Sequence, residues 1–162
     1  MKQIAVGEEV YALQLTCDDI KDGSEWVGSP IESLQAQRMK YPAGKEFRVH
    51  HHVLNPRLIK RTQEAFIVIS GILAVDVYDN KRNLLGTLVA SPGEAIFLYR
   101  GGHGVRVIED FIGYEVKAGS FSYVSEDKEA LEVSVPGKIE TVNVERPAGL
   151  PEKLREVSNE RP

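Results

Sequence analysis

The amino-acid sequence predicts an all-β fold, either a sandwich or a barrel, with little helix. Short strand-like runs recur at intervals of ~8 to 12 residues and are separated by turn signals. The strongest run is AFIVISGILAVDVYD at residues 65–79, which is dense in Ile, Val, Phe and Tyr. This spacing differs from that of a parallel sheet, in which crossover helices join the strands.

The first half of the chain contains three predicted strands. Residues 9–16 form the first strand, and a loop rich in Asp, Gly and Ser follows it. Residues 34–41 form the second strand, which ends at a turn containing Pro and Gly. Residues 46–54 form the third strand, and Pro56 prevents its extension because proline has no N–H to donate to a sheet.

The second half of the chain continues the same pattern. Residues 65–79 are interpreted as two strands hinged at Ser70-Gly71. Turns rich in Gly, Pro, Asp and Asn then separate four further strands, at residues 84–90, 95–99, 104–109 and 112–119. Two edge strands are predicted at residues 130–135 and 139–144. The last dozen residues form either one helical turn or a frayed tail.

Length and composition predict a single soluble domain. A chain of 162 residues can bury a real core, and its hydrophobic content of 42% and charged content of 27% are typical of globular proteins. Its apolar runs are shorter than the ~20 residues of a membrane span. Glu8 and Glu9 interrupt the segment that a signal peptide would keep apolar, so we expect a cytoplasmic protein with no membrane contact.

Charge and cysteine content exclude some classes of function. The formal net charge of -4 and the pI of about 5.6 argue against a broad nucleic-acid-binding surface. Cys17 is the single cysteine, so the chain can form neither an intrachain disulfide nor a cysteine-rich zinc site.

Histidines provide the clearest indication of chemistry. His50 and His52 project from one face if residues 46–54 form a regular strand, because side chains on a strand alternate in direction. We therefore expect His50, His52, Glu64 and His103 to converge on one metal ion. His51 points the other way on a regular strand, and a β-bulge would exchange its role with that of a neighbour.

Less specific interpretations of these residues remain open. The histidine cluster, with Arg48 and Arg57 nearby, is also consistent with a solvent-facing or phosphate-contacting group. Glu64 is also consistent with a surface ion pair to Arg61 or Lys60, which contributes little to stability.

The same residues resemble the first motif of the cupin superfamily of small β-barrels. That motif is Gly, five residues, His-x-His, three or four residues, Glu, six residues, Gly. Gly44 with His50 and His52 matches its front half, and Glu64 with Gly71 matches its back half. Eleven residues separate the two halves here, which implies an inserted loop.

A second stretch resembles the second cupin motif, which is Gly, five residues, Pro-x-Gly, two residues, His, three residues, Asn. Gly93 is followed after five residues by Tyr99-Arg100-Gly101-Gly102-His103. Tyrosine replaces the proline, the histidine comes one place early, and no asparagine follows at the expected distance. The succession TQE, VISG, DVYD, GGHG and EVKAG is similar to a group of small cupins that we associate with sugar and polysaccharide metabolism.

The resemblance implies a double-stranded β-helix, or jelly-roll, barrel. Its core would cover about residues 34–118 of a single domain, 1–162, with the strand 9–16 before it and the edge strands and tail 130–162 after it. It also implies that His50, His52, Glu64 and His103 bind one divalent transition metal ion, Fe, Mn, Ni, Cu or Zn. Such a ligand set leaves open positions for water and substrate.

These expectations lead to a predicted function. The chain is expected to be an enzyme that acts on a sugar derivative or oxo acid in the barrel, by metal-assisted isomerase, epimerase or lyase chemistry or as an iron dioxygenase. The resemblance also allows a metal-free epimerase, in which His50 or His103 pairs with Tyr99 or Tyr114 as acid and base. The alternative is a non-catalytic metabolite-binding or regulatory module.

Polar residues near the predicted metal site are candidates for substrate contact. Arginine suits an anionic group because its planar fork matches carboxylate and phosphate. The candidates are Gln37, Arg48, Gln63 and Arg106. We also expect a homodimer, since small barrels of this kind often pair through their sheets, with the N-terminal strand and residues 130–144 able to supply an interface.

Overall fold

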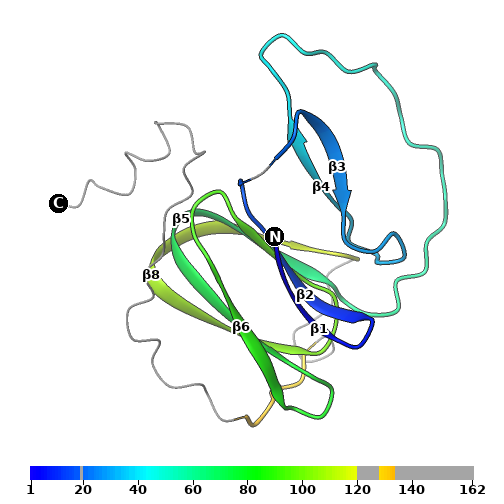
Figure 1. Cartoon of the computed structure of the whole chain (residues 1–162). Helices are drawn as coiled ribbons and strands as arrows, with labels where there is room; N and C mark the ends of the chain where they lie inside the picture. Colours follow the sequence, from blue (N-terminus) through cyan, green and yellow to red (C-terminus); the bar gives the residue numbers. More distant parts are fainter. Residues whose placement is uncertain (19, 120–127, 134–162) are drawn as a thin grey trace.

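The computed structural model describes residues 1–18, 20–119 and 128–133. These residues form eight strands and no helix, so the prediction of an all-β fold is confirmed (Figure 1). The strands are β1 (Lys2–Val6), β2 (Glu9–Leu15), β3 (Gly23–Val27), β4 (Ala36–Lys40), β5 (Glu64–Tyr78), β6 (Leu84–Ala90), β7 (Ala95–Leu98) and β8 (Gly102–Lys117).

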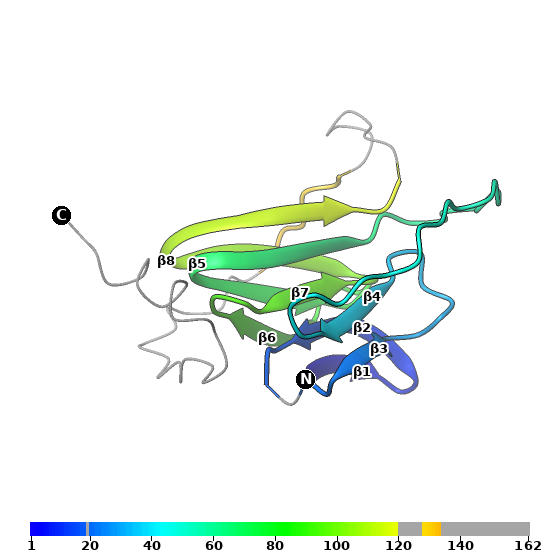
Figure 2. The same ribbon diagram turned by 90° about the horizontal axis from the view of Figure 1, so that it is seen from above.

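Six strands form one strongly curled sheet, a half-barrel consistent with a jelly roll (Figure 1). The strand order is β1-β2-β7-β5-β6, and β8 pairs with β5. Seen from above, β8 and β1 lie on opposite sides of the molecule with β5 and β7 between them (Figure 2). The strands β3 and β4 form a separate two-stranded sheet, which we call the β3–β4 lobe.

The antiparallel pair of β5 and β8 carries most of the curl. Glu64 lies opposite Lys117 at one end of this pair, and Val77 lies opposite His103 near the other end. A straight strand would separate residues 64 and 77 by about 43 Å. In the structure, however, the side chains of Glu64 and His103 are in contact. The two ends of the ribbon have therefore been brought together by bending.

The bend lies in the middle of β5, where the register with β8 shifts between Val68 and Leu73. Such bulges increase twist and let a strand change direction. Gly71 lies inside this region with a φ of 79°, a left-handed conformation that favours glycine. A Cβ at this position would lie 2.0 Å from the carbonyl oxygen of Asp110. The bend thus requires glycine both for its conformation and for the close approach of β8.

Two apolar clusters support the sheet. The larger one lies within the half-barrel and includes Val68, Leu73 and Ile96, which are almost completely buried. The smaller one lies between the main sheet and the β3–β4 lobe, and it contains Leu13, Val27, Ala36 and Tyr99. Hydrophobic burial therefore fixes the lobe against β2 and the end of β7.

Most predicted strands are present. The strands predicted at residues 9–16, 34–41, 84–90 and 95–99 correspond to β2, β4, β6 and β7. The two strands predicted within residues 65–79 are the single strand β5, which bends through bulges. The two strands predicted at residues 104–109 and 112–119 are the single strand β8, which continues unbroken. The strands β1 and β3 were not predicted.

The predicted strand at residues 46–54 is wrong. Residues 42–63 form no strand, and up to the buried Gln63 they follow an open arc away from both sheets (Figure 1). Their apolar side chains are exposed, and Val49, for example, is 97% exposed. Strand propensity depends on pairing and on burial of one face, and this segment has neither. The argument that strand alternation would place His50 and His52 on one face therefore loses its basis.

The C-terminal predictions are tested only in part. Residues 130–133 contain no strand, while residues 134–135, the strand at 139–144 and the tail lie outside the described residues.

Within the described ranges, none of the chain forms a helix long and apolar enough to cross a membrane. The homodimer stays a prediction.

Replacing Gly71 by alanine is expected to destabilise the fold by about 2 to 5 kcal/mol, from left-handed strain and the clash with β8. The measurement is the free energy of unfolding in urea. Gly7→Ala is the matched control, because Gly7 has a φ of 59° but a Cβ added there would meet nothing within 4 Å. An equal loss in both variants would show that the bend does not depend on the close approach at Gly71.

Candidate functional site

A groove of about 900 Å³ lies beside the two ends of the β5–β8 ribbon. Its walls include Glu64 from the start of β5 and His103 from the start of β8. Asp76, Arg106 and Lys128 also line it. Both acidic and basic side chains thus converge on one concave surface, as expected of a site that orients a small polar ligand.

Glu64 and His103 contact each other in the wall of this groove. Nε2 of His103 lies 3.0 Å from Oε2 of Glu64. The glutamate side chain is 6% exposed, whereas the histidine side chain is 27% exposed and can be reached from solvent. The ring of Phe66 meets the His103 ring edge-on, with 6.3 Å between ring centroids. The imidazole is therefore held from two sides and remains accessible.

Lysines neutralise the other oxygen of Glu64. Lys117 lies directly opposite Glu64 in the ladder, and its Nζ is 2.7 Å from Oε1. Nζ of Lys128 is 3.9 Å from the same oxygen. The contact from His103 is the largest cause that lowers the pKa of Glu64 to about 2, and Lys117 lowers it further against the opposing effect of burial. Glu64 is therefore ionised over the whole physiological range.

A second ion pair strengthens the groove wall. Nε and Nη2 of Arg106 each lie 2.7 Å from a carboxylate oxygen of Asp76, which is nearly fully buried. Burial raises the pKa of Asp76, but hydrogen bonds from Arg106 and Thr87 outweigh it and lower the pKa overall. This bidentate pair uses the fork of Arg106 for structure, since buried charges must be paired.

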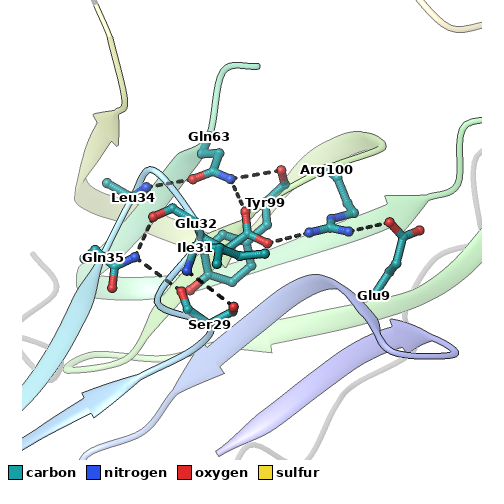
Figure 3. A network of polar contacts seen from close by, with 9 residues as sticks. All are labelled: Glu9, Ser29, Ile31, Glu32, Leu34, Gln35, Gln63, Tyr99 and Arg100. Atoms are coloured by element: carbon teal, nitrogen blue, oxygen red, sulfur yellow. Dashed lines mark hydrogen bonds and ion pairs between the residues drawn. The ribbon is translucent and has the colours of Figure 1, made fainter. Parts of the chain in front are cut away.

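The structure separates the predicted site residues into several groups. Glu64, His103 and Arg106 line the groove. Tyr99 and Gln63 are buried away from solvent in the polar network of Figure 3. Tyr114 is 65% exposed, and Gln37 lies half-buried on β4. Arg48, His50 and His52 are exposed in the arc at residues 42–63.

The expected convergence of four metal ligands is therefore not observed. Among the described residues, no group of three or more His, Cys, Asp or Glu side chains could hold a metal ion. The rings of His50 and His52 lie close to each other, 5.4 Å apart, but on the exposed arc.

Glu64 and His103 alone fit part of a transition-metal site. Oε2 of Glu64 is buried and has no well-aligned hydrogen bond despite its short contact with His103. A carboxylate oxygen and an imidazole nitrogen are suitable ligands for zinc or iron. Two ligands do not complete such a site, and His50 and His52 lie outside it on the exposed arc.

Sequence reasoning missed several residues that contribute to the groove or support it. Lys117 contacts Glu64 only because the two are paired across the ladder, and the sequence does not reveal that register. Asp76 lies in the strand predicted at residues 65–79, where no pattern indicates a role in a site. Lys128 and Arg82 lie in segments for which no pattern indicated a site.

Comparison of the chain with family models, curated proteins and solved structures found no match. The fold and the groove therefore rest on the structure, and any function rests on the chemistry of the groove.

Replacing His103 by glutamine is expected to raise the pKa of Glu64 from about 2 toward its ordinary value of 4.5. A lowered pKa contributes stability that is present above pH 4.5 and is lost as the pH falls toward 2. Between pH 4.5 and 2, the free energy of unfolding of the variant should therefore fall less than that of the wild type. Carboxyl ¹³C NMR and urea unfolding across the interval measure both effects.

The matched control for this titration is His51→Gln, which removes an exposed imidazole from the arc and should leave the Glu64 titration unchanged. If Glu64 titrates at the same pH with and without His103, the two side chains do not interact in solution.

Proposed function

We propose that this chain is a cupin-like barrel protein, an enzyme that binds a small polar or anionic molecule in the groove and acts on it by proton transfer. The observation that supports this most directly is the contact between buried, ionised Glu64 and accessible His103. A carboxylate that orients an imidazole is a common arrangement in general acid–base catalysis.

In this proposal His103 exchanges a proton with the bound molecule. One ring nitrogen faces Glu64, so the other ring nitrogen is the one that serves the ligand. Glu64 cannot leave its place easily, because Lys117 holds its second oxygen. The reaction class is isomerisation, epimerisation or elimination next to a carbonyl group. A sugar derivative or an oxo acid is a suitable substrate, because it contains such a carbonyl.

Two cations support an anionic ligand. Arg82 and Lys128 line the groove with side chains that are about half exposed. Their ion pairs with described residues are long, at 3.6 Å for Arg82 to Glu129 and 3.9 Å for Lys128 to Glu64. Such long, exposed pairs contribute little, so both cations can turn to a ligand at low cost.

A panel of sugar phosphates and oxo acids tests this proposal by NMR of the protein in H₂O, where the backbone amide signals are visible. Binding is expected to shift the amide signals of groove residues. The single variants Arg82→Gln and Lys128→Gln should each weaken the affinity for the anionic ligand roughly fivefold. Lys45→Gln, on the exposed arc, is the control. Binding that shifts only amides outside the groove would contradict the proposed site.

The same panel of ligands in D₂O separates an enzyme from a binding module. Proton transfer exchanges a C–H of the ligand for deuterium, and His103→Gln is expected to slow this exchange at least 100-fold, a typical contribution of general acid–base catalysis. A wild-type protein that binds a ligand but exchanges none of its hydrogens would favour the non-catalytic, metabolite-binding alternative.

A metal-bound form is the second candidate, favoured by the buried Oε2 of Glu64 that lacks an aligned hydrogen bond. His50 and His52 would have to join Glu64 and His103 to hold the ion. When bound, the metal would supply Lewis-acid chemistry toward a carbonyl or hydroxyl of the substrate.

This candidate predicts that untagged protein retains a stoichiometric amount of Zn²⁺, Fe²⁺ or Ni²⁺ after dialysis, measured by ICP-MS. Glu64→Gln, His50→Gln and His52→Gln should each lower the affinity for the metal at least about 10-fold, the smallest loss typical even of an outer-shell partner. His51→Gln is expected to retain it. Equal retention in all four variants would place the metal elsewhere.

A further inference from the structure

Glu32 lies in the connection between β3 and β4 and does not line the groove, yet it contacts Arg100, which does, and Gln63, which precedes Glu64. Its side chain is 10% exposed. One carboxylate oxygen, Oε1, accepts a hydrogen bond from Arg100. The other, Oε2, accepts one from Nε2 of Gln63 at 2.5 Å. Figure 3 shows both contacts made by the one carboxylate.

Gln63 is the residue immediately before Glu64, and its position is fixed by several bonds. Its Oε1 accepts a hydrogen bond from the backbone N–H of Leu34 at 2.7 Å. Its carbonyl oxygen accepts one from the N–H of Ala118 at 2.8 Å, next to Lys117. Because Gln63 is 2% exposed and its side-chain amide is bonded on both sides, it has little freedom to move.

Arg100 lies three residues before His103, on the other chain segment that forms the site. Nη1 of Arg100 donates to Glu9 at 2.7 Å, and Nη2 donates to Glu32. Its side chain is 14% exposed, so the ion pair with Glu32 is largely shielded from water. Charge-assisted hydrogen bonds of this kind are stronger than neutral ones.

We infer that Glu32 is a positioning residue, which clamps the segment that carries Glu64 to the segment that carries His103 and so sets the distance between the two side chains. The Glu32 carboxylate joins the residue before Glu64 to the approach to His103. It adds to the ladder pairing of Glu64 with Leu98 and to the hydrogen bond from Gln63 to the carbonyl oxygen of Tyr99 at 3.4 Å. The inference rests on the proposed function in so far as the Glu64–His103 pair is the working site.

The clamp also connects the β3–β4 lobe to the groove. The turn that carries Glu32 is held by a hydrogen bond from the N–H of Glu32 to the carbonyl oxygen of Ser29, at 3.2 Å. Nε2 of Gln35 donates to the carbonyl oxygen of Glu32 at 2.5 Å. A displacement of the lobe is therefore transmitted through the Glu32 carboxylate to both sides of the site.

The test uses the full chain with Glu32→Gln and Glu32→Ala. The glutamine variant keeps the shape of the side chain but loses the charge that pairs with Arg100. The control is Glu25→Gln, which removes the partner of Arg38 in the same lobe, where the glutamate side chain is 51% exposed. Two readouts are compared with the free energy of unfolding.

The first readout is the nuclear Overhauser effect between the ring protons of His103 and Phe66, which reports the position of His103 against the start of β5. It is expected to weaken in Glu32→Gln, to disappear in Glu32→Ala and to remain unchanged in Glu25→Gln. If both Glu32 variants are less stable but keep the wild-type effect, Glu32 has a merely structural role and the inference is overturned.

The second readout is the rate of deuterium exchange into a ligand, identified with the wild-type protein, at saturating ligand concentration. A misplaced His103 is expected to reduce this rate roughly tenfold in Glu32→Gln, as for the loss of one charge-assisted hydrogen bond. The first readout needs no ligand, so it tests the clamp independently. A weakened Phe66 contact in a chain that binds no ligand would support the clamp and refute the proposed function.

Discussion

The bend in the β5–β8 ribbon is the constraint on which the rest of the structure depends. Hydrogen bonding between two long antiparallel strands would by itself keep their ends far apart. The bulges around Gly71 remove that consequence, because they let the first half of β5 pair with β7 and the second half with β6. The half-barrel, its core and the groove between the ends all follow from this change of direction.

Electrostatics then determines what the groove contains. A buried carboxylate is unfavourable unless it is paired, and Glu64 meets this requirement with His103 on one oxygen and Lys117 on the other. Asp76 meets it with Arg106, and Glu32 with Arg100. Each pair joins segments distant in sequence, so the charges that make the groove polar also fix its walls relative to one another.

The fold was more predictable from the sequence than the site. Alternation and turn residues locate β2, β6 and β7 because these features are local. The bend in β5 was visible only as a glycine between two apolar runs, which equally suggests a hinge between two strands. Residues 46–54 have strand-like composition, but whether a strand forms depends on a neighbour that local sequence does not specify.

The pairing of Glu64 with Lys117 and the clamp by Glu32 depend on register and on packing of the lobe, so no spacing rule would have revealed them. His103 and Glu64 were predicted because their motif context is distinctive.

The register of β5 against β8 also has a consequence for how the chain folds. Glu64 and Lys117 begin and end a ribbon whose connecting chain includes β6 and β7, so their contact forms only after a large loop has closed. Non-local pairing of this kind slows folding, since the entropy of loop closure is lost before the contacts are gained. The groove is thus a product of the complete topology and has no counterpart in any fragment that ends before β8. During synthesis, Glu64 and His103 in its wall can meet only once most of the described chain has left the ribosome.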